Sequence, residues 1–163
     1  PHARGGAAGP QWASHGFTSV AQHEALLADA HAKVAAGEGE ALLPIRYFQF
    51  VPITAARYVA LAARGGSDDY FSSDFTDEEL RQRLGHLSGQ GAALRTLFVL
   101  SAADEYVPSS VDVRALARRF AAAAGADTVI VAGANHNLSE PADAVEQFVS
   151  ATVKCLGSVE EVS

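Results

Sequence analysis

The sequence has no methionine and only one cysteine among its 163 residues. A single cysteine cannot form a disulfide within the chain, and Cys155 falls in an apolar helical pattern that favours a small buried side chain. No apolar run reaches the roughly 20 residues of a membrane-spanning helix, and the first residues lack the apolar core of a signal peptide. These absences favour a cytoplasmic protein with no membrane partner.

Basic residues are also scarce, with 12 Lys and Arg against 19 Asp and Glu, for a formal net charge of −7. An acidic surface argues against nucleic-acid binding, because that interaction requires a positive face that displaces counterions from phosphates. Hydrophobic residues make up 48% of the chain and charged residues 19%, which excludes a disordered tail and predicts a globular domain with a buried core.

The first part of the chain changes character several times. Residues 1–19 are rich in Gly, Ala and Pro and follow no helical or strand period, so we interpret them as irregular or as foreign to the fold. Residues 20–163 are interpreted as part of one domain, which starts with a helix at residues 23–36. Residues 41–91 combine clustered aromatics, prolines and helical pieces, a pattern more typical of a lid than of a sheet. Within them, Thr76 and Glu79 have the spacing of a helix capping box.

The last seventy residues alternate between strand and helix patterns. The run LRTLFVLS at residues 94–101 predicts a strand buried on both faces, and a helix with one apolar face follows at residues 113–124. A second strand is predicted at residues 128–132, and a final helix carries an apolar stripe from Val145 to Leu156. This order predicts an α/β fold with a mostly parallel sheet flanked by helices.

An acid and a histidine follow the two predicted strands. Asp104 lies three residues beyond the first strand and His136 four residues beyond the second. In open α/β sheets, catalytic and ligand-binding side chains lie on loops beyond the carboxyl ends of the strands, so both side chains are expected at one edge of the sheet. A carboxylate can accept the imidazole Nδ1–H while Nε2 takes the proton of a serine. Glu105 is an equally acidic candidate, and turn formation or surface exposure would explain the same residues without catalysis.

The segments SAADEYVP, containing Asp104, and VIVAGANHNLSEP, containing His136, resemble the C-terminal end of α/β-hydrolases. Together with PITAARYVALAARGGSDDYFSSDFTDEEL they resemble more narrowly a fungal and plant family of unknown-function hydrolases that includes esterases of fusarinine-type siderophores. The resemblance covers about residues 20–156 and implies a helical lid, Asp104 as triad acid and His136 as general base. It implies carboxylic ester hydrolysis through an acyl-serine intermediate, with a small-molecule ester substrate and no cofactor or metal. It implies no role for the segment from Asp68 to Asp74.

The nucleophile of such an enzyme is missing from the expected place. A serine nucleophile occupies a G-x-S-x-G turn between a strand and a helix, and the nearest approach here, Trp12-Ala13-Ser14-His15-Gly16, has no preceding apolar strand. We therefore expect that Ser14 is not the nucleophile. The start at Pro1 agrees with a C-terminal fragment that lacks the nucleophile and is inactive alone. Such a fragment would expose apolar faces of an incomplete sheet and would associate with itself.

Other features support weaker alternatives. His23 and His31 are too far apart on one helix to share a metal, so solvated or half-buried histidines are expected. Ser72 and Ser73 lie in a polar turn before a helix and are interpreted as capping residues, with contact to a substrate in the lid as the alternative. The competing function is a non-catalytic α/β binding or interaction module, and the oligomeric state and the substrate stay open. An aromatic cluster is expected to pack mainly within the lid, with a lipophilic or catechol-like pocket as the alternative. It consists of Tyr47, Phe48, Phe50, Tyr58, Tyr70 and Phe71.

Overall fold

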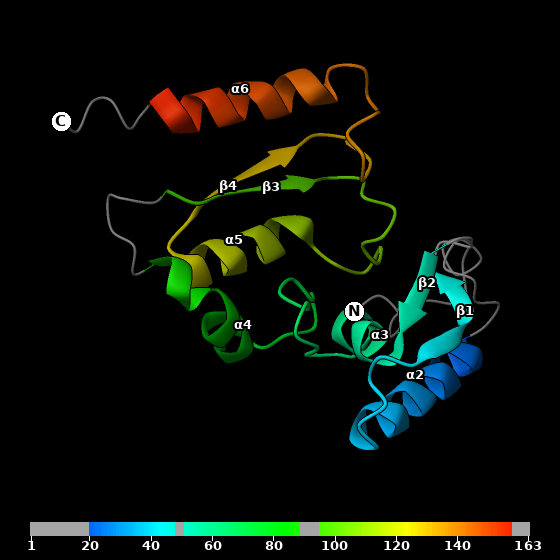
Figure 1. The fold of residues 1–163 in the computed structure, drawn as a ribbon. Coiled ribbons are helices and arrows are strands. Elements are labelled where there is room, and N and C mark those ends of the chain that lie inside the picture. Colours follow the sequence, from blue (N-terminus) through cyan, green and yellow to red (C-terminus); the bar gives the residue numbers. More distant parts are fainter. Residues whose placement is uncertain (1–19, 48–50, 89–94, 158–163) are drawn as a thin grey trace. The chain divides into compact units, whose positions relative to one another are not determined.

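A computed structural model describes residues 20–47, 51–88 and 95–157 (Figure 1). The chain divides into two compact units, residues 1–74 and residues 75–163. The expectations for residues 1–19, including the one for Ser14, fall outside the described residues. The predicted lid at residues 41–91 includes parts of both units, and its role stays a prediction. Within the described ranges, no helix has the length and apolar character needed to cross a membrane.

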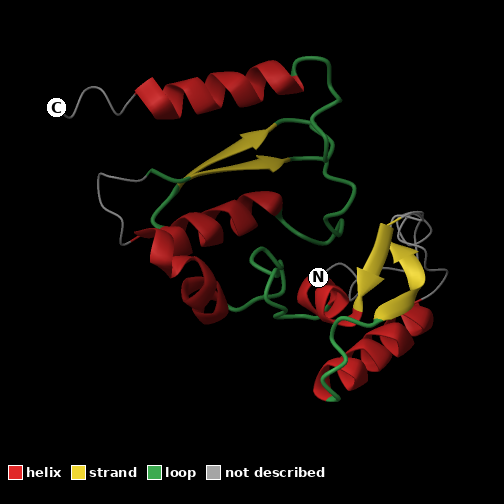
Figure 2. Cartoon of the chain, viewed as in Figure 1, coloured by secondary structure: helices red, strands yellow, loops and turns green. Residues whose placement is uncertain are grey.

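The first unit combines two helices with a β-hairpin (Figure 2). Helix α2 spans Val20–Ala35, strands β1 and β2 span Leu42–Tyr47 and Val51–Thr54, and α3 spans Ala55–Ala62. β1 and β2 pair antiparallel, which the sequence analysis did not predict for this proline-containing stretch. A proline removes one ladder hydrogen bond, and this is tolerated on edge strands. In a two-stranded sheet both strands have an open edge, so Pro44 and Pro52 are compatible with the hairpin.

The core of the first unit contains a buried polar pair. Tyr58 is fully buried between the helices and the hairpin, in a cluster that includes Leu43 and Ile53. Its hydroxyl lies 2.7 Å from Nδ1 of His23, whose side chain is also buried. The expectation of a solvated or half-buried histidine is therefore wrong for His23, whereas His31 is exposed. Pairing removes the cost of burying two polar groups, so this contact links α2 to α3.

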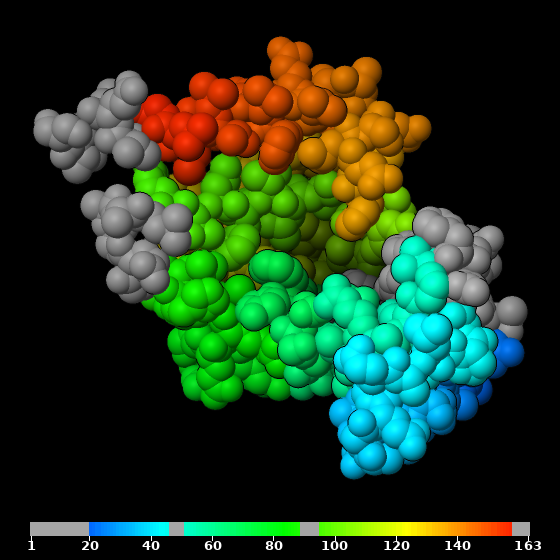
Figure 3. All heavy atoms as spheres, viewed as in Figure 1, coloured from blue at the N-terminus to red at the C-terminus, as the bar shows by residue number. Residues whose placement is uncertain are grey.

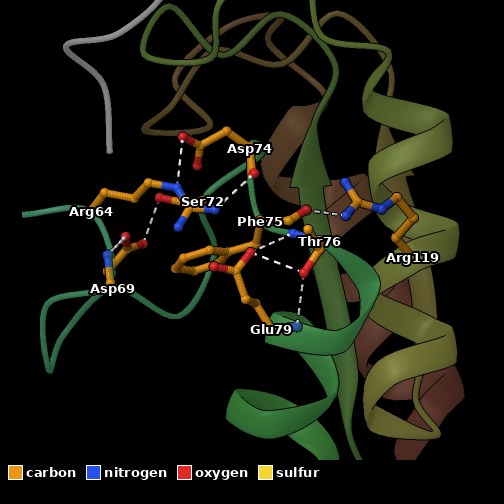
Figure 4. Close-up of polar contacts among 9 residues, drawn as sticks. Arg64, Asp69, Ser72, Asp74, Phe75, Thr76, Glu79 and Arg119 are labelled. Carbon is orange, nitrogen blue, oxygen red and sulfur yellow. Dashed lines mark hydrogen bonds and ion pairs between the residues drawn. The ribbon is translucent and has the colours of Figure 1, made fainter.

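The segment from Asp68 to Asp74 is held by its own side chains (Figure 4). The buried carboxylate of Asp69 accepts hydrogen bonds from the Gly65 N–H at 2.9 Å and from the hydroxyl of Ser72 at 2.6 Å. Arg64 Nε donates to the Asp74 carboxylate at 3.2 Å. The capping interpretation of Ser72 is thus wrong, because its hydroxyl closes a local turn with Asp69. The turn leaves the intervening side chains at positions 70 and 71 exposed.

The second unit begins with a capped helix, α4, at Asp77–Leu84. The predicted capping box is present: the Glu79 N–H donates to the Thr76 hydroxyl at 3.2 Å, and the Thr76 N–H donates to the Glu79 carboxylate at 2.7 Å (Figure 4). Arg119 donates to Asp77 at 2.6 Å and also to the backbone carbonyl of Phe75, which ties the start of α4 to the next helix.

Strands β3 (Leu97–Ser101) and β4 (Asp127–Val131) pair in parallel over their whole length. Helix α5 (Val113–Ala124) connects them and ends at Gly125, whose φ of 61° lies in the left-handed region that favours glycine. In Figure 1, α5 and α6 (Ala144–Gly157) lie on opposite faces of this strand pair. The β–α–β order is as predicted. The largest buried cluster of the unit lies between α4, α5 and the sheet and consists of Phe75, Leu80, Leu84, Leu116, Phe120, Ala123 and Ala124.

Helix α6 differs from the sequence expectation. Its apolar stripe is exposed, from Val145 at 54% to Leu156 at 64%, and Figure 3 shows α6 on an outer face of the unit. Ala144 is the buried residue of the helix, and Cys155 is half-buried rather than fully buried. β3 is likewise half-buried along its length. The described sheet of this unit has only two strands. A sheet of this width is too narrow to cover the whole apolar stripe of α6, and α5 and α6 do not fully cover the two faces of β3.

Candidate active site

Two loops leave the carboxyl ends of β3 and β4 side by side. Ser101 is the last residue of β3 and pairs with Val131, the last residue of β4. Backbone hydrogen bonds continue the contact beyond the strands, because the Ala102 N–H donates to the Val131 carbonyl at 3.0 Å and the Ala103 N–H to the Ala134 carbonyl at 2.9 Å. The parallel register therefore brings residues about thirty positions apart to the same edge of the sheet.

Asp104 and His136 meet at this edge. His136 Nδ1 lies 3.0 Å from Asp104 Oδ2, a hydrogen-bond distance. The other carboxylate oxygen, Oδ1, accepts the N–H of Tyr106 at 2.9 Å, so the carboxylate is held in place by its own loop. The Asp104 side chain is 18% exposed and the His136 side chain 52% exposed. The carboxylate is thus partly shielded from water, while the imidazole remains accessible.

Glu105 contacts the same histidine at a different atom. Its Oε2 accepts the backbone N–H of His136 at 2.9 Å. The sequence left Asp104 and Glu105 as equivalent acidic candidates, and the structure separates them, because Asp104 contacts the imidazole and Glu105 the main chain. Tyr106 adds a third contact: its ring packs edge-on against the His136 ring, with centroids 4.8 Å apart and planes at 71°.

The loop that carries His136 is braced by Asn135. The Asn135 side chain accepts the Ser139 N–H at 2.9 Å and donates to the Ser139 hydroxyl at 2.8 Å. Its backbone N–H donates to the carbonyl of Glu140 at 3.1 Å. The sequence reasoning missed Asn135 and Tyr106. An asparagine in a glycine-containing loop predicts a turn. Only the folded structure shows which backbone groups the asparagine bonds to.

The arrangement can perform proton transfer. An imidazole whose Nδ1–H is donated to a carboxylate presents Nε2 as a proton acceptor, and the carboxylate stabilises the imidazolium formed. Within the described part of the chain, Nε2 of His136 has no hydrogen-bond partner and no serine hydroxyl bonds to this ring. The same ranges contain no group of three or more His, Cys, Asp or Glu side chains placed to bind a metal ion.

The sequence is similar to two curated fungal esterases. It is 35% identical over 115 residues to fusarinine C esterase of Aspergillus fumigatus, covering 64% of this chain and 30% of that protein. It is also 35% identical over 120 residues to an esterase of Emericella nidulans, esterase AN6793, covering 63% of this chain and 32% of that protein. The chain therefore aligns with about a third of the length of the curated relatives it matches.

A solved structure is similar as well. Siderophore hydrolase EstB from Aspergillus fumigatus superposes with a TM-score of 0.67 at 26% identity, covering 91% of this chain and 53% of that one. This likeness to a hydrolase confirms the predicted α/β-hydrolase fold class. A family model matches residues 11–156, starting nine residues before the resemblance found from the sequence and therefore including Ser14. The match covers most of the chain, which belongs to the family described as proteins of unknown function DUF1749, a family with esterase-like α/β-hydrolase relatives.

Proposed function

We propose that the chain contributes the acid and the general base of a serine esterase that cleaves small-molecule carboxylic esters. The observation that carries the proposal is the 3.0 Å contact between His136 Nδ1 and Asp104 Oδ2 at the carboxyl ends of two parallel strands. Esterase relatives and a hydrolase structural neighbour support the reaction class.

In the proposed reaction, Nε2 of His136 removes the proton of a serine hydroxyl as its oxygen attacks the ester carbonyl. The imidazolium then gives this proton to the departing alcohol, which leaves an acyl-serine. In the second half, His136 accepts a proton from the water that attacks the acyl-serine, and the imidazolium returns this proton to the departing serine oxygen as the carboxylic acid is released. Asp104 holds the Nδ1–H tautomer and stabilises the imidazolium in both halves.

The serine itself is predicted to lie outside these 163 residues. A fluorophosphonate probe, which reacts with activated serines, tests this part of the proposal on the chain alone. We expect no covalent labelling. Labelling that is lost in a Ser14→Ala variant would overturn the prediction for Ser14 and would place a nucleophile within the chain.

A hybrid enzyme tests the acid–base roles. Residues 20–156 of this chain would replace the aligned segment of the Aspergillus fumigatus esterase, which supplies its own remaining sequence, and hydrolysis of fusarinine C and of p-nitrophenyl acetate would be measured. We expect an active hybrid whose turnover falls by about three orders of magnitude or more in a His136→Ala variant.

The matched control is His31→Ala, which removes an exposed histidine on α2. It should leave turnover unchanged. Near-normal turnover of the His136→Ala hybrid, with an unchanged circular dichroism spectrum, would contradict the proposed role. A folded but inactive parent hybrid would favour a non-catalytic binding module.

A further inference from the structure

We propose that Glu105 is a positioning residue that holds the main chain of His136, so that the imidazole stays against Asp104. The proposal rests on the proposed function, because it assigns Glu105 a task in orienting the general base. It gives two neighbouring carboxylates in one loop separate roles, one at the ring of the histidine and one at its backbone.

The geometry places a contact on each part of His136. Asp104 Oδ2 lies 3.0 Å from the ring atom Nδ1, and Glu105 Oε2 accepts the backbone N–H at 2.9 Å. The ring of Tyr106 packs edge-on against the imidazole. Three consecutive residues thus contact one histidine from the neighbouring loop. Because both the backbone N–H and the ring atom Nδ1 of His136 are hydrogen-bonded, rotation about the side-chain bonds of His136 is restricted.

Hydrogen bonds within the loop that follows β3 hold Asp104 and Glu105 in place for these contacts. The Tyr106 N–H bonds to the Asp104 carboxylate at 2.9 Å, and the Val107 N–H bonds to the Asp104 carbonyl at 3.1 Å. These two bonds form a tight turn around Asp104. With the turn closed, the side chains of Asp104 and Glu105 both reach the loop that carries His136.

Packing covers only part of His136, although the ring of Tyr106 contacts its imidazole. Its side chain is 52% exposed, and its loop is otherwise anchored at neighbouring positions, by the Ala103–Ala134 backbone bond and by the Asn135 brace. Glu105 is the anchor on the main chain of His136 itself. A displacement of a reacting group by about 1 Å can lower a rate a hundredfold, so a backbone anchor at the general base affects catalysis without touching substrate.

The hydrogen bond and the charge of Glu105 can be separated by substitution. Glu105→Gln keeps an oxygen that can accept the His136 N–H but removes the charge, whereas Glu105→Ala removes both. Glu105→Asp keeps the charge on a side chain one methylene shorter. Glu140→Ala is the matched control, because it removes a negative charge from the loop of His136 while leaving the bond to its N–H in place. Among the described residues, the titratable side chains in contact with His136 are Asp104, Glu105 and Tyr106, all from the neighbouring loop, and Glu140 lies four positions after His136 in its own loop.

The test measures the imidazole tautomer of His136 in the 163-residue chain by nitrogen-15 NMR, at a pH where the ring is neutral. A His136→Asn variant assigns the signals. We expect mainly the Nδ1–H tautomer in the parent chain, in Glu105→Gln and in Glu140→Ala. In Glu105→Ala the Nδ1–H fraction should fall at least twofold, and exchange of the His136 amide proton should accelerate about tenfold.

Three results would overturn the proposal: a parent-like tautomer and amide exchange in Glu105→Ala, an equal loss in Glu105→Gln, or the same loss in Glu140→Ala. If Glu105→Ala fails to fold by circular dichroism, Glu105→Asp decides, and a parent-like result for it counts against the proposal. No turnover is needed, so an inactive hybrid enzyme would leave this result intact. A parent chain without the Nδ1–H tautomer would instead remove the basis of the proposed function.

Discussion

Asp104 Oδ2 lies 3.0 Å from His136 Nδ1 although 32 positions separate the two residues in the sequence. The contact exists because β3 and β4 are parallel neighbours with an unbroken register, and each residue follows the carboxyl end of its strand. An aspartate in this position keeps an imidazole in the orientation and tautomer of a general base.

Replacing Asp104 by Asn in the hybrid esterase should lower kcat by about 10³- to 10⁴-fold, because the amide no longer holds the Nδ1–H tautomer or stabilises the imidazolium. KM should change little. The control is Asp127→Asn, which removes the carboxylate that pairs with Arg95 at the opposite end of β4. Steady-state kinetics with p-nitrophenyl acetate measure both, and an equal loss in the two variants would contradict the assignment.

Replacing Asp69 by Ala should lower the free energy of unfolding by about 1–3 kcal/mol, because the buried Ser72 hydroxyl and the Gly65 N–H lose their shared acceptor. The neighbouring Asp68 forms a surface ion pair with Arg57. Asp68→Ala is therefore the control and should cost at most about 1 kcal/mol. Urea unfolding followed by circular dichroism distinguishes them, and equal costs would argue against a structural role for Asp69.

Loss of the capping box should weaken α4. Thr76→Ala removes the acceptor of the Glu79 N–H and should lower the free energy of unfolding by about 1 kcal/mol. Thr76→Ser keeps the hydroxyl and should stay within a few tenths of the parent value. The same urea titration measures both, and a Ser variant as unstable as the Ala variant would show that the hydroxyl is not the cause.

The cap of α5 should make stability depend on pH. The Ala115 N–H bonded to the Asp112 carboxylate is the main cause that lowers the pKa of Asp112 below its usual 3.8, with the Arg114 N–H and nearby Arg118 adding to it. A lowered pKa in the folded state stabilises the protein above pH 3.8, and this contribution disappears as the pH falls through the folded value.

Asp112→Ala should therefore lower the thermal midpoint at neutral pH, and its difference from the parent should shrink as the pH drops below 3.8. Asp112→Ser keeps a capping oxygen but no charge, so its difference from the Ala variant should not depend on pH. Calorimetry across this pH range measures both differences. A parent–Ala difference that grows toward low pH would have the wrong sign.

The exposed stripe of α6 should promote self-association of the isolated chain. Val149 and Val153 are 49% and 61% exposed on this stripe. A Val149→Glu, Val153→Glu double variant should shift sedimentation toward the monomer, because charges disfavour burial of the stripe against another surface. Ser150→Glu adds charge to an exposed site beside the stripe and should have little effect. A parent chain that sediments as a compact monomer at all concentrations would contradict the expectation.

The features predictable from the sequence were those that depend on nearby residues. The capping box requires only that Thr76 and Glu79 are three positions apart on a forming helix, and Gly125 ends α5 because glycine accepts a positive φ. Long apolar runs separated by an amphipathic helix identified β3, α5 and β4. The positions of Asp104 and His136 after these strands then followed from the geometry of parallel sheets.

The features that the sequence did not reveal depend on partners distant in the chain. The sequence by itself determined the capping box of α4, the β–α–β order and the acid and histidine that follow the strands, because local backbone preferences and apolar periodicity suffice for these. Only the tertiary structure decided that β1 and β2 pair antiparallel, that His23 is buried against Tyr58, and that Asp104 rather than Glu105 contacts the imidazole. Each of these features depends on contacts between residues that are distant in the sequence. Two adjacent carboxylates such as Asp104 and Glu105 look equivalent in the sequence, and only the folded structure shows which one contacts the imidazole and which one the main chain.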